Sequence, residues 1–154
     1  MKKLIVIVAL ALAAITANAQ AYIGGGVNLR PLGGGAASIT VSPEIGYALS
    51  ATTAVGAIVA INSVGGTTQF ALNPYYRYGF KQFGKVMLFT DAEIQIVSAG
   101  GATTFGAGIA PGAAMQLNDH ISLVARFGQV GYYNGGFTLS IGTALNQVTL
   151  YYHF

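Results

Sequence analysis

The chain contains no cysteine and no tryptophan, and only 7% of its 154 residues are charged. The lack of cysteine excludes disulfide bonds and thiolate metal ligands. Ordinary soluble domains carry roughly 25% charged residues, so a folded surface of this composition would aggregate in water. With 53% hydrophobic residues and 22 glycines, the composition favours a protein that lies in an apolar environment.

The N-terminus has the three parts of a secretory signal peptide. Two lysines follow the first methionine, an apolar run covers residues 4–15, and a small-x-small cleavage site follows at residues 17–19. We therefore predict a signal peptide over residues 1–19 and a single mature domain over residues 20–154, with cleavage after Ala21 as an alternative. An N-terminal membrane anchor fits less well, because the run is shorter than the roughly 20 residues that a spanning helix needs.

Long hydrophobic runs are absent from the rest of the chain. Beyond residue 19 no stretch approaches the roughly 18 uninterrupted apolar residues that indicate a transmembrane helix. A chain that lies in lipid without such helices can satisfy its backbone only in a closed β-barrel. Charge gives no support for a nucleic-acid partner: without Lys2 and Lys3, five basic residues stand against four acidic ones, and they are scattered.

The last nine residues carry the clearest strand signal. Apolar and polar side chains alternate along NQVTLYYHF, and in a strand successive side chains face opposite sides. The apolar face of this segment consists of Val148, Leu150, Tyr152 and Phe154. That face suits lipid and the other suits a lumen, so the segment is typical of the closing strand of an outer-membrane barrel.

Glycine-rich or polar breaks divide the mature chain into eight such segments. We predict an all-β fold, an eight-stranded antiparallel up-and-down transmembrane β-barrel, with strands of about 10 residues that each cross an apolar layer of about 25 Å. An even number of strands places both termini on one side of the membrane, the periplasmic side. The predicted strands cover residues 22–30, 38–47, 53–62, 68–80, 86–97, 103–117, 120–132 and 137–154.

The last predicted strand is too long for one span, and its apolar residues change from odd to even positions. A β-bulge near Asn146 would reconcile the two phases. The first half could then pair with the preceding strand as a hairpin that protrudes above the membrane, across a tight turn at residues 134–136. Alternatively, residues 133–145 form a loop.

Aromatic residues collect at both ends of the predicted strands, as in the interfacial girdles of membrane barrels. The group predicted at the periplasmic ends consists of Tyr47, Tyr78, Phe80, Tyr152 and Phe154. The group predicted near the outer ends consists of Phe70, Phe105, Tyr132 and Phe137. Aromatic residues favour strands of any kind, but clustering at both ends favours girdles.

If the apolar positions face lipid, the opposite parity places most of the charges inside the barrel. The predicted lumen charge network consists of Glu44, Arg77, Asp91, Glu93 and Arg126. An eight-stranded barrel is just wide enough for side chains to fill, and buried charges are retained when they are paired. We therefore predict a salt-bridged plug, or alternatively a gate that switches partners to open a narrow water path. Small inward residues over residues 106–114 leave room for long side chains opposite.

The sequence offers little for catalysis. An acyl-transfer or proteolytic site would need a base beside a nucleophile at the outer rim. The only histidines are His120 and His153, both predicted at the periplasmic end, and the glycine runs at residues 24–26 and 33–35 lack the context of a phosphate-binding loop. We expect no enzymatic activity, no cofactor and no metal site.

The signal peptide, the eight segments and the terminal aromatic residue resemble the small outer-membrane β-barrel superfamily of OmpX-like, OmpA-transmembrane-like and opacity-type proteins. PEIGY at residues 43–47, NPYYRY at 73–78 and LYYHF at 150–154 carry the resemblance. It implies a location in the bacterial outer membrane, in contact with lipid and lipopolysaccharide. It also implies that the barrel assembly machinery and periplasmic chaperones read a C-terminal assembly signal at Val148, Leu150, Tyr152 and Phe154.

Three roles fit these observations. We favour a structural protein whose packed barrel supports envelope integrity. The alternatives are a narrow ion or small-solute channel and a surface interaction protein, adhesin-like or lipid-binding, that acts through protruding outer hairpins. A soluble barrel carrier is the alternative fold, but it would expose the charged residues on an otherwise poorly solvated surface. The sequence does not determine the oligomeric state.

Overall fold

The computed structural model describes residues 21–31, 37–64, 66–133, 135–141 and 148–154. The predicted signal peptide and the predicted bulge at Asn146 lie outside these residues. The described residues lie in strands and in the turns and bends that join them. None of these segments contains a helix long and apolar enough to cross a membrane.

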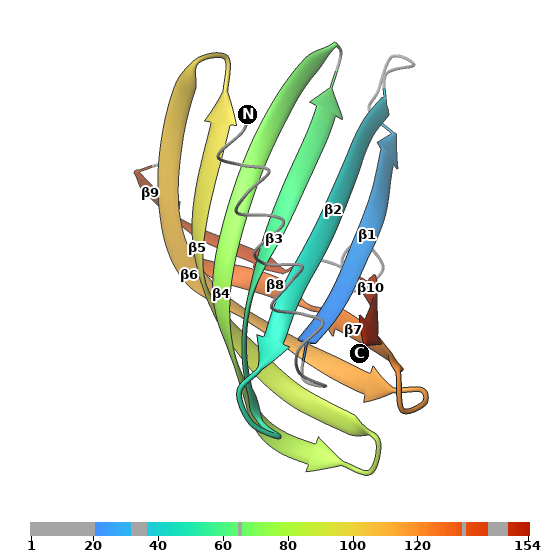
Figure 1. Cartoon of the computed structure of the whole chain (residues 1–154). Coiled ribbons are helices and arrows are strands. Elements are labelled where there is room, and N and C mark those ends of the chain that lie inside the picture. The colour runs from blue at the N-terminus through green and yellow to red at the C-terminus, as the bar shows by residue number, and fades with distance from the viewer. Residues whose placement is uncertain (1–20, 32–36, 65, 134, 142–147) are drawn as a thin grey trace.

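Ten strands form one antiparallel sheet (Figure 1). They are β1 (Ala21–Pro31), β2 (Ala37–Ala48), β3 (Thr53–Val64), β4 (Thr67–Phe83), β5 (Val86–Ala99), β6 (Ala102–Gln116), β7 (Ile121–Arg126), β8 (Gly128–Tyr133), β9 (Gly136–Ile141) and β10 (Val148–His153). The alternating segments of the sequence become strands because alternation gives each strand one apolar and one more polar face.

Eight of the strands close into a ring. Neighbouring strands follow the order β5, β4, β3, β2, β1, β10, β7, β6, and β5 also pairs with β6. The first and last strands meet where Tyr22 lies opposite His153. The predicted closed eight-stranded antiparallel up-and-down barrel is thus confirmed. We call the end where β1 begins and β10 ends the terminal end, and the opposite end the distal end.

The predicted strand over residues 120–132 is divided into β7 and β8 by a bulge. The register of both against β6 shifts by one residue, from Gly112 opposite Arg126 to Ile109 opposite Val130. Phe127 still donates its backbone N–H to the carbonyl of Pro111. Because a one-residue shift exchanges the two faces of a strand, the bulge turns Tyr133 into the lumen.

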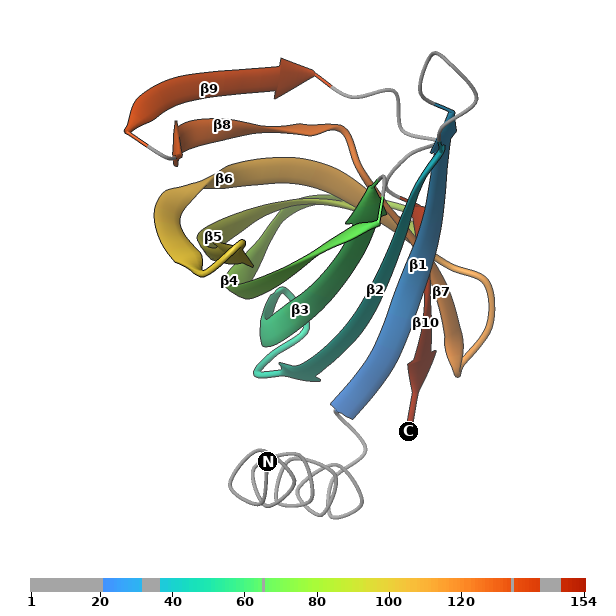
Figure 2. The same ribbon diagram turned by 90° about the horizontal axis from the view of Figure 1, so that it is seen from above.

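The predicted hairpin at the distal end is present. β8 and β9 pair along their whole length, with Tyr133 opposite Gly136 at one end and Gly128 opposite Ile141 at the other. Figure 2 shows that they extend the sheet beyond β6. The predicted continuous strand over residues 137–154 is therefore represented by β9 and β10, with residues 142–147 outside the described part. Among the described strands, β9 pairs with β8 alone.

The connection between β5 and β6 is shorter than the predicted break at residues 98–102. Ala99 lies opposite Ala102, and only Gly100 and Gly101 join them. Both glycines have positive φ, 57° and 84°. This is the geometry of the two-residue hairpin turns whose twist matches that of the strands, and glycine adopts it without steric cost.

Burial in the barrel is inverted relative to a soluble domain. The buried polar and charged residues include Glu44, Arg77, Asp91, Glu93 and Arg126, whereas many large apolar side chains are exposed, such as Leu150 at 56%. The outward rows are thus apolar and the lumen is polar. Of the aromatic residues predicted to form two girdles, all except Tyr47 are among the exposed ones.

Glycines on the inner wall make room for aromatic side chains. A Cβ atom built on the glycine would collide with the aromatic ring in each of five pairs: Gly24 with Tyr151, Gly46 with Tyr22, Gly56 with Tyr75, Gly106 with Tyr133, and Gly112 with Phe89. In each pair the ring covers a glycine on a neighbouring strand. The predicted space beside the small residues of 106–114 is thus occupied by Phe89 and Tyr133.

We expect Gly112→Ala to lower the free energy of unfolding by about 1–3 kcal/mol, the usual cost of overpacking a filled core. The new methyl group would lie 2.6 Å from the backbone oxygen of Ala125 and would also meet the Phe89 ring. The matched control is Gly25→Ala, because the nearest atoms to a Cβ built there lie 3.5 Å away. Urea unfolding in lipid vesicles measures the free energy of unfolding of both purified variants. An equal loss of stability in the two would contradict the packing role of Gly112.

Candidate functional site

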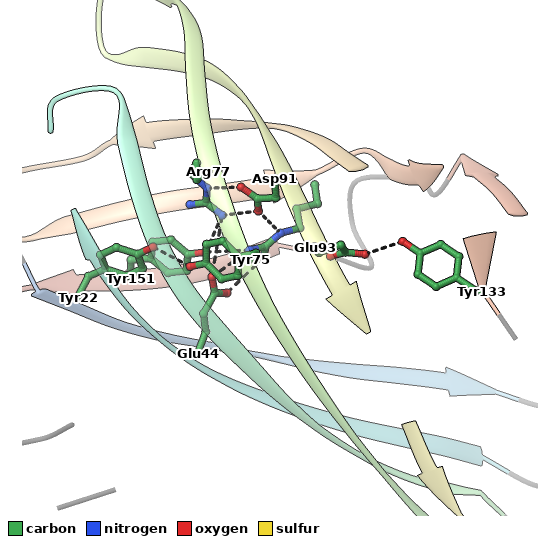
Figure 3. Close-up of polar contacts among 9 residues, drawn as sticks. Tyr22, Glu44, Tyr75, Arg77, Asp91, Glu93, Tyr133 and Tyr151 are labelled. Carbon is green, nitrogen blue, oxygen red and sulfur yellow. Dashed lines mark hydrogen bonds and ion pairs between the residues drawn. The ribbon is translucent and has the colours of Figure 1, made fainter. Parts of the chain in front are cut away.

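The lumen holds a cluster of four ion-paired residues from four strands. Glu44 comes from β2, Arg77 from β4, Asp91 from β5 and Arg126 from β7, each at an inward position. The β4–β5 register places Arg77 directly opposite Asp91. All four are at least nine-tenths buried, with Asp91 at 0% exposure. We call these four residues the plug (Figure 3).

Asp91 is held by both arginines. Arg77 donates two parallel hydrogen bonds to Asp91, from Nε to Oδ1 at 2.7 Å and from Nη2 to Oδ2 at 2.8 Å. Arg126 adds a bond from its Nε to Oδ2 at 3.0 Å. Two-pronged arginine–carboxylate contacts combine charge with a fixed planar geometry, so they position the guanidinium as well as stabilise it.

Arg126 bridges to the opposite side of the lumen through Glu44. Its Nη2 lies 2.9 Å from Oε1 of Glu44, and its Nη1 lies 3.3 Å from Oε2. The hydroxyl of Tyr151 also donates to Oε1 of Glu44, at 2.5 Å. The same hydroxyl accepts hydrogen bonds from Arg77 at 3.2 Å and from Arg126 at 3.3 Å. Tyr151 is therefore the shared centre of the plug.

These contacts cross the full width of the barrel. In the eight-membered ring β4 and β10 are four positions apart in either direction, so the Arg77–Tyr151 hydrogen bond joins opposite walls. The plug is supported by rings on its terminal side. The ring of Tyr22 stacks on that of Tyr151, with centroids 5.0 Å apart. The hydroxyl of Tyr22 forms a hydrogen bond with the hydroxyl of Tyr75 at 2.6 Å. The Arg77 guanidinium lies 3.9 Å from the centroid of the Phe89 ring.

Glu93 lies in the same lumen but takes no part in these ion pairs. Its hydrogen-bond partner is the hydroxyl of Tyr133, which donates to Oε1 at 3.0 Å. Figure 3 shows the contact of Glu93 leading to Tyr133 on β8, away from Glu44 and Arg77. Of the five residues predicted to form one charge network, the structure thus brings four together and sets the fifth aside.

Sequence reasoning did not assign the tyrosines to the network. Tyr22, Tyr75 and Tyr151 fall on the inward parity of their strands, so strand alternation contains the signal for them. No such signal places Tyr133 inside, because its orientation depends on the bulge at Phe127.

The other residues singled out in the sequence lie at or near the terminal end. The predicted C-terminal assembly signal, Val148, Leu150, Tyr152 and Phe154, presents exposed side chains on the outer face. His153 points inward, and its Nε2 lies 2.8 Å from the hydroxyl oxygen of Ser122. The Nδ1 of His120 lies 3.1 Å from the backbone oxygen of His153. These contacts fasten the end of β10 to β7.

A cavity of about 360 Å³ occupies the terminal half of the lumen. Tyr22, Arg77 and Tyr151 line it on the plug side, and polar residues such as Gln82, Lys85 and Asp119 line it near the turns. Of these residues only Arg77 belongs to the plug, so the plug borders the cavity on the distal side.

Neither the models of known protein families nor the curated protein sequences contain a match to this chain. Function must therefore be argued from the geometry of the described residues. Within those residues, no group of three or more histidine, aspartate or glutamate side chains is placed to hold a metal ion. What the plug supplies is two arginines and two carboxylates that are paired across the lumen.

We expect Arg126→Met to lower the free energy of unfolding by about 3–5 kcal/mol, because it leaves Glu44 and Asp91 with an excess of buried negative charge. The control Lys85→Met removes an exposed charge and should change the free energy of unfolding by less than about 0.5 kcal/mol. Chemical unfolding in lipid vesicles measures both. If Arg126→Met proves as mild as the control, the plug does not stabilise the barrel.

Proposed function

We propose that this protein is a small integral outer-membrane β-barrel with a structural role in the cell envelope, and that its lumen is closed. Both termini would lie in the periplasm, so the terminal end would face the periplasm and the distal end the outside. In this role the barrel adds a rigid, lipid-embedded unit to the outer membrane and gives passage to no solute. Its C-terminal strand would be the segment read during assembly.

The inverted burial carries the membrane part of this proposal. The exposed residues include large apolar side chains from many of the strands, such as Val27 at 70% and Phe105 at 67%. Contiguous apolar surface of this extent marks a surface that is covered by another apolar phase. A soluble carrier would need the opposite arrangement, with an apolar lumen, whereas the buried set here contains three carboxylates and two arginines.

The plug supports the closed lumen. Four charged side chains and Tyr151 bond to one another across the barrel, and each ion pair is buried. Opening a water path would require at least one arginine to leave its carboxylates, and separating buried charges from their partners is costly. The channel alternative therefore needs a second arrangement of these side chains, with other partners for them.

We expect the purified protein to give no discrete current steps in a planar lipid bilayer, because the plug closes the lumen. Heat-modifiable gel migration of the same sample confirms beforehand that the barrel is folded. The double variant Arg126→Ala with Tyr151→Ala removes the centre of the plug and should produce steps if it remains folded. Steps in the unaltered protein that change with Arg77→Ala would instead establish the channel function.

The β8–β9 hairpin favours a second candidate function, surface interaction. Its outward side chains include Tyr132, Phe137 and Leu139, which are among the more exposed apolar residues of the chain. β9 pairs with no other described strand than β8, so its second edge could recruit an extended segment by strand addition. The same apolar face could contact lipopolysaccharide.

For this candidate we expect Phe137→Ser with Leu139→Ser to abolish the thermal stabilisation that lipopolysaccharide gives the protein, while the barrel remains folded. The control Phe83→Ser removes an exposed aromatic ring near the terminal end and should leave the stabilisation intact. Melting of the barrel in vesicles with and without lipopolysaccharide measures the effect. Equal stabilisation of all three proteins would exclude the hairpin as the contact.

A further inference from the structure

Glu93 is a buried carboxylate without an ion pair. It is 6% exposed, and no described lysine or arginine lies within salt-bridge distance of it. The Tyr133 hydroxyl bonds one of its oxygens, and the described residues give the other oxygen no hydrogen bond. An ionised carboxylate has room for about four hydrogen bonds, so most of its capacity is unused.

The plug does not neutralise Glu93. Arg77 and Arg126 carry two positive charges, and Glu44 and Asp91 carry two negative charges, so the plug is neutral as a unit. Glu93 therefore adds one net negative charge to the described lumen. A buried charge is costly unless a partner of opposite sign accompanies it. Among the described residues, Glu93 thus lacks a matching positive charge.

A second acceptor stands on β4, at the position diagonal to Glu93. The side-chain oxygen of Asn73 is buried and has no hydrogen-bond partner, and it is the one such atom among the described side chains. Tyr75 lies opposite Glu93 in the β4–β5 register, so Asn73, two residues along the same face, is the diagonal neighbour of Glu93. Buried polar atoms without partners are rare, and an unseen ion or water is a usual reason.

Tyr133 is held against Glu93. Its ring covers two glycines of β6, and a Cβ atom on either Gly106 or Gly108 would collide with it. Gly108 lies opposite Glu93 in the β5–β6 register, which brings the hydroxyl to the carboxylate. The three oxygen groups therefore come from β4, β5 and β8, on the distal side of the plug. A solute that enters from the distal end does not cross the plug to reach them.

We propose that Glu93, Asn73 and Tyr133 form a binding site for one monovalent cation, an alkali metal ion or a protonated primary amine. The Glu93 carboxylate supplies the negative charge, and the amide oxygen of Asn73 is a neutral ligand or acceptor. The Tyr133 hydroxyl can contribute a lone pair while it donates its proton to Glu93. A single positive charge matches the charge of Glu93, whereas a divalent ion would exceed it. Oxygen donors suit hard cations and ammonium groups alike.

The test is the thermal stability of the purified protein in uncharged detergent micelles at fixed pH and fixed ionic strength. The reference sample contains tetrabutylammonium, which is too large for the site, as its only cation. In the other samples sodium, potassium or methylammonium replaces it. A cation that binds only the folded state stabilises it, and at 100 times its dissociation constant the unfolding equilibrium shifts about 100-fold. We expect this shift in the unaltered protein, a smaller one in Asn73→Ala, and none in Glu93→Gln.

Asp119→Asn, which removes an exposed carboxylate at the other end of the barrel, should keep the full response. A response to sodium or potassium alone identifies an alkali ion, and a response to methylammonium alone identifies an amine. The proposal is overturned if the unaltered protein and Glu93→Gln respond equally or not at all. It is also overturned if infrared spectra show a protonated carboxyl band that Glu93→Gln removes.

Discussion

The pairing of two arginines with two carboxylates inside the barrel is the interaction on which the rest of the structure depends. An eight-stranded barrel leaves an interior that side chains must fill, and these four side chains cannot be left unpaired there. The plug joins strands that are far apart in the ring, because Arg126 contacts Glu44 and Asp91 together. It therefore links strands that make no backbone contact with one another.

The inner-wall glycines follow from the same constraint. Arginine and tyrosine side chains long enough to meet in the middle need space beside the wall, and a glycine on a neighbouring strand provides it. Phe89 makes both kinds of contact: the far end of its ring lies at Gly112, and the Arg77 guanidinium lies 3.9 Å from its ring centroid. The high glycine content of the chain is thus a packing requirement as much as a feature of its turns.

A barrel filled in this way is asymmetric along its axis. The terminal half contains a cavity that is bounded by the plug, whereas the distal half contains Glu93 and Tyr133 and carries the β8–β9 hairpin. Chemistry available to a solute therefore differs on the two sides. The proposed structural role depends on the plug between them, while the proposed cation site needs only the distal half.

The number of strands in the barrel, their antiparallel order and the charges that face inward could all be predicted from the sequence. Each of these follows from local alternation, since a strand places every second side chain on the same face. Glu44 and Arg77 could be assigned to the lumen for that reason alone. The positions of the turns could be predicted only approximately, because strand pairing extends β4 to Phe83, into the expected break at residues 81–85.

Tertiary structure alone decided which partners the inward residues take. Parity cannot distinguish Asp91 from Glu93, two residues apart on one face, yet only Asp91 lies at the height of both arginines. The one-residue bulge at Phe127 is equally invisible in the sequence, and it turns Tyr133 toward Glu93. Register and height along the axis are properties of the closed ring, so they arise only when all the strands are in place.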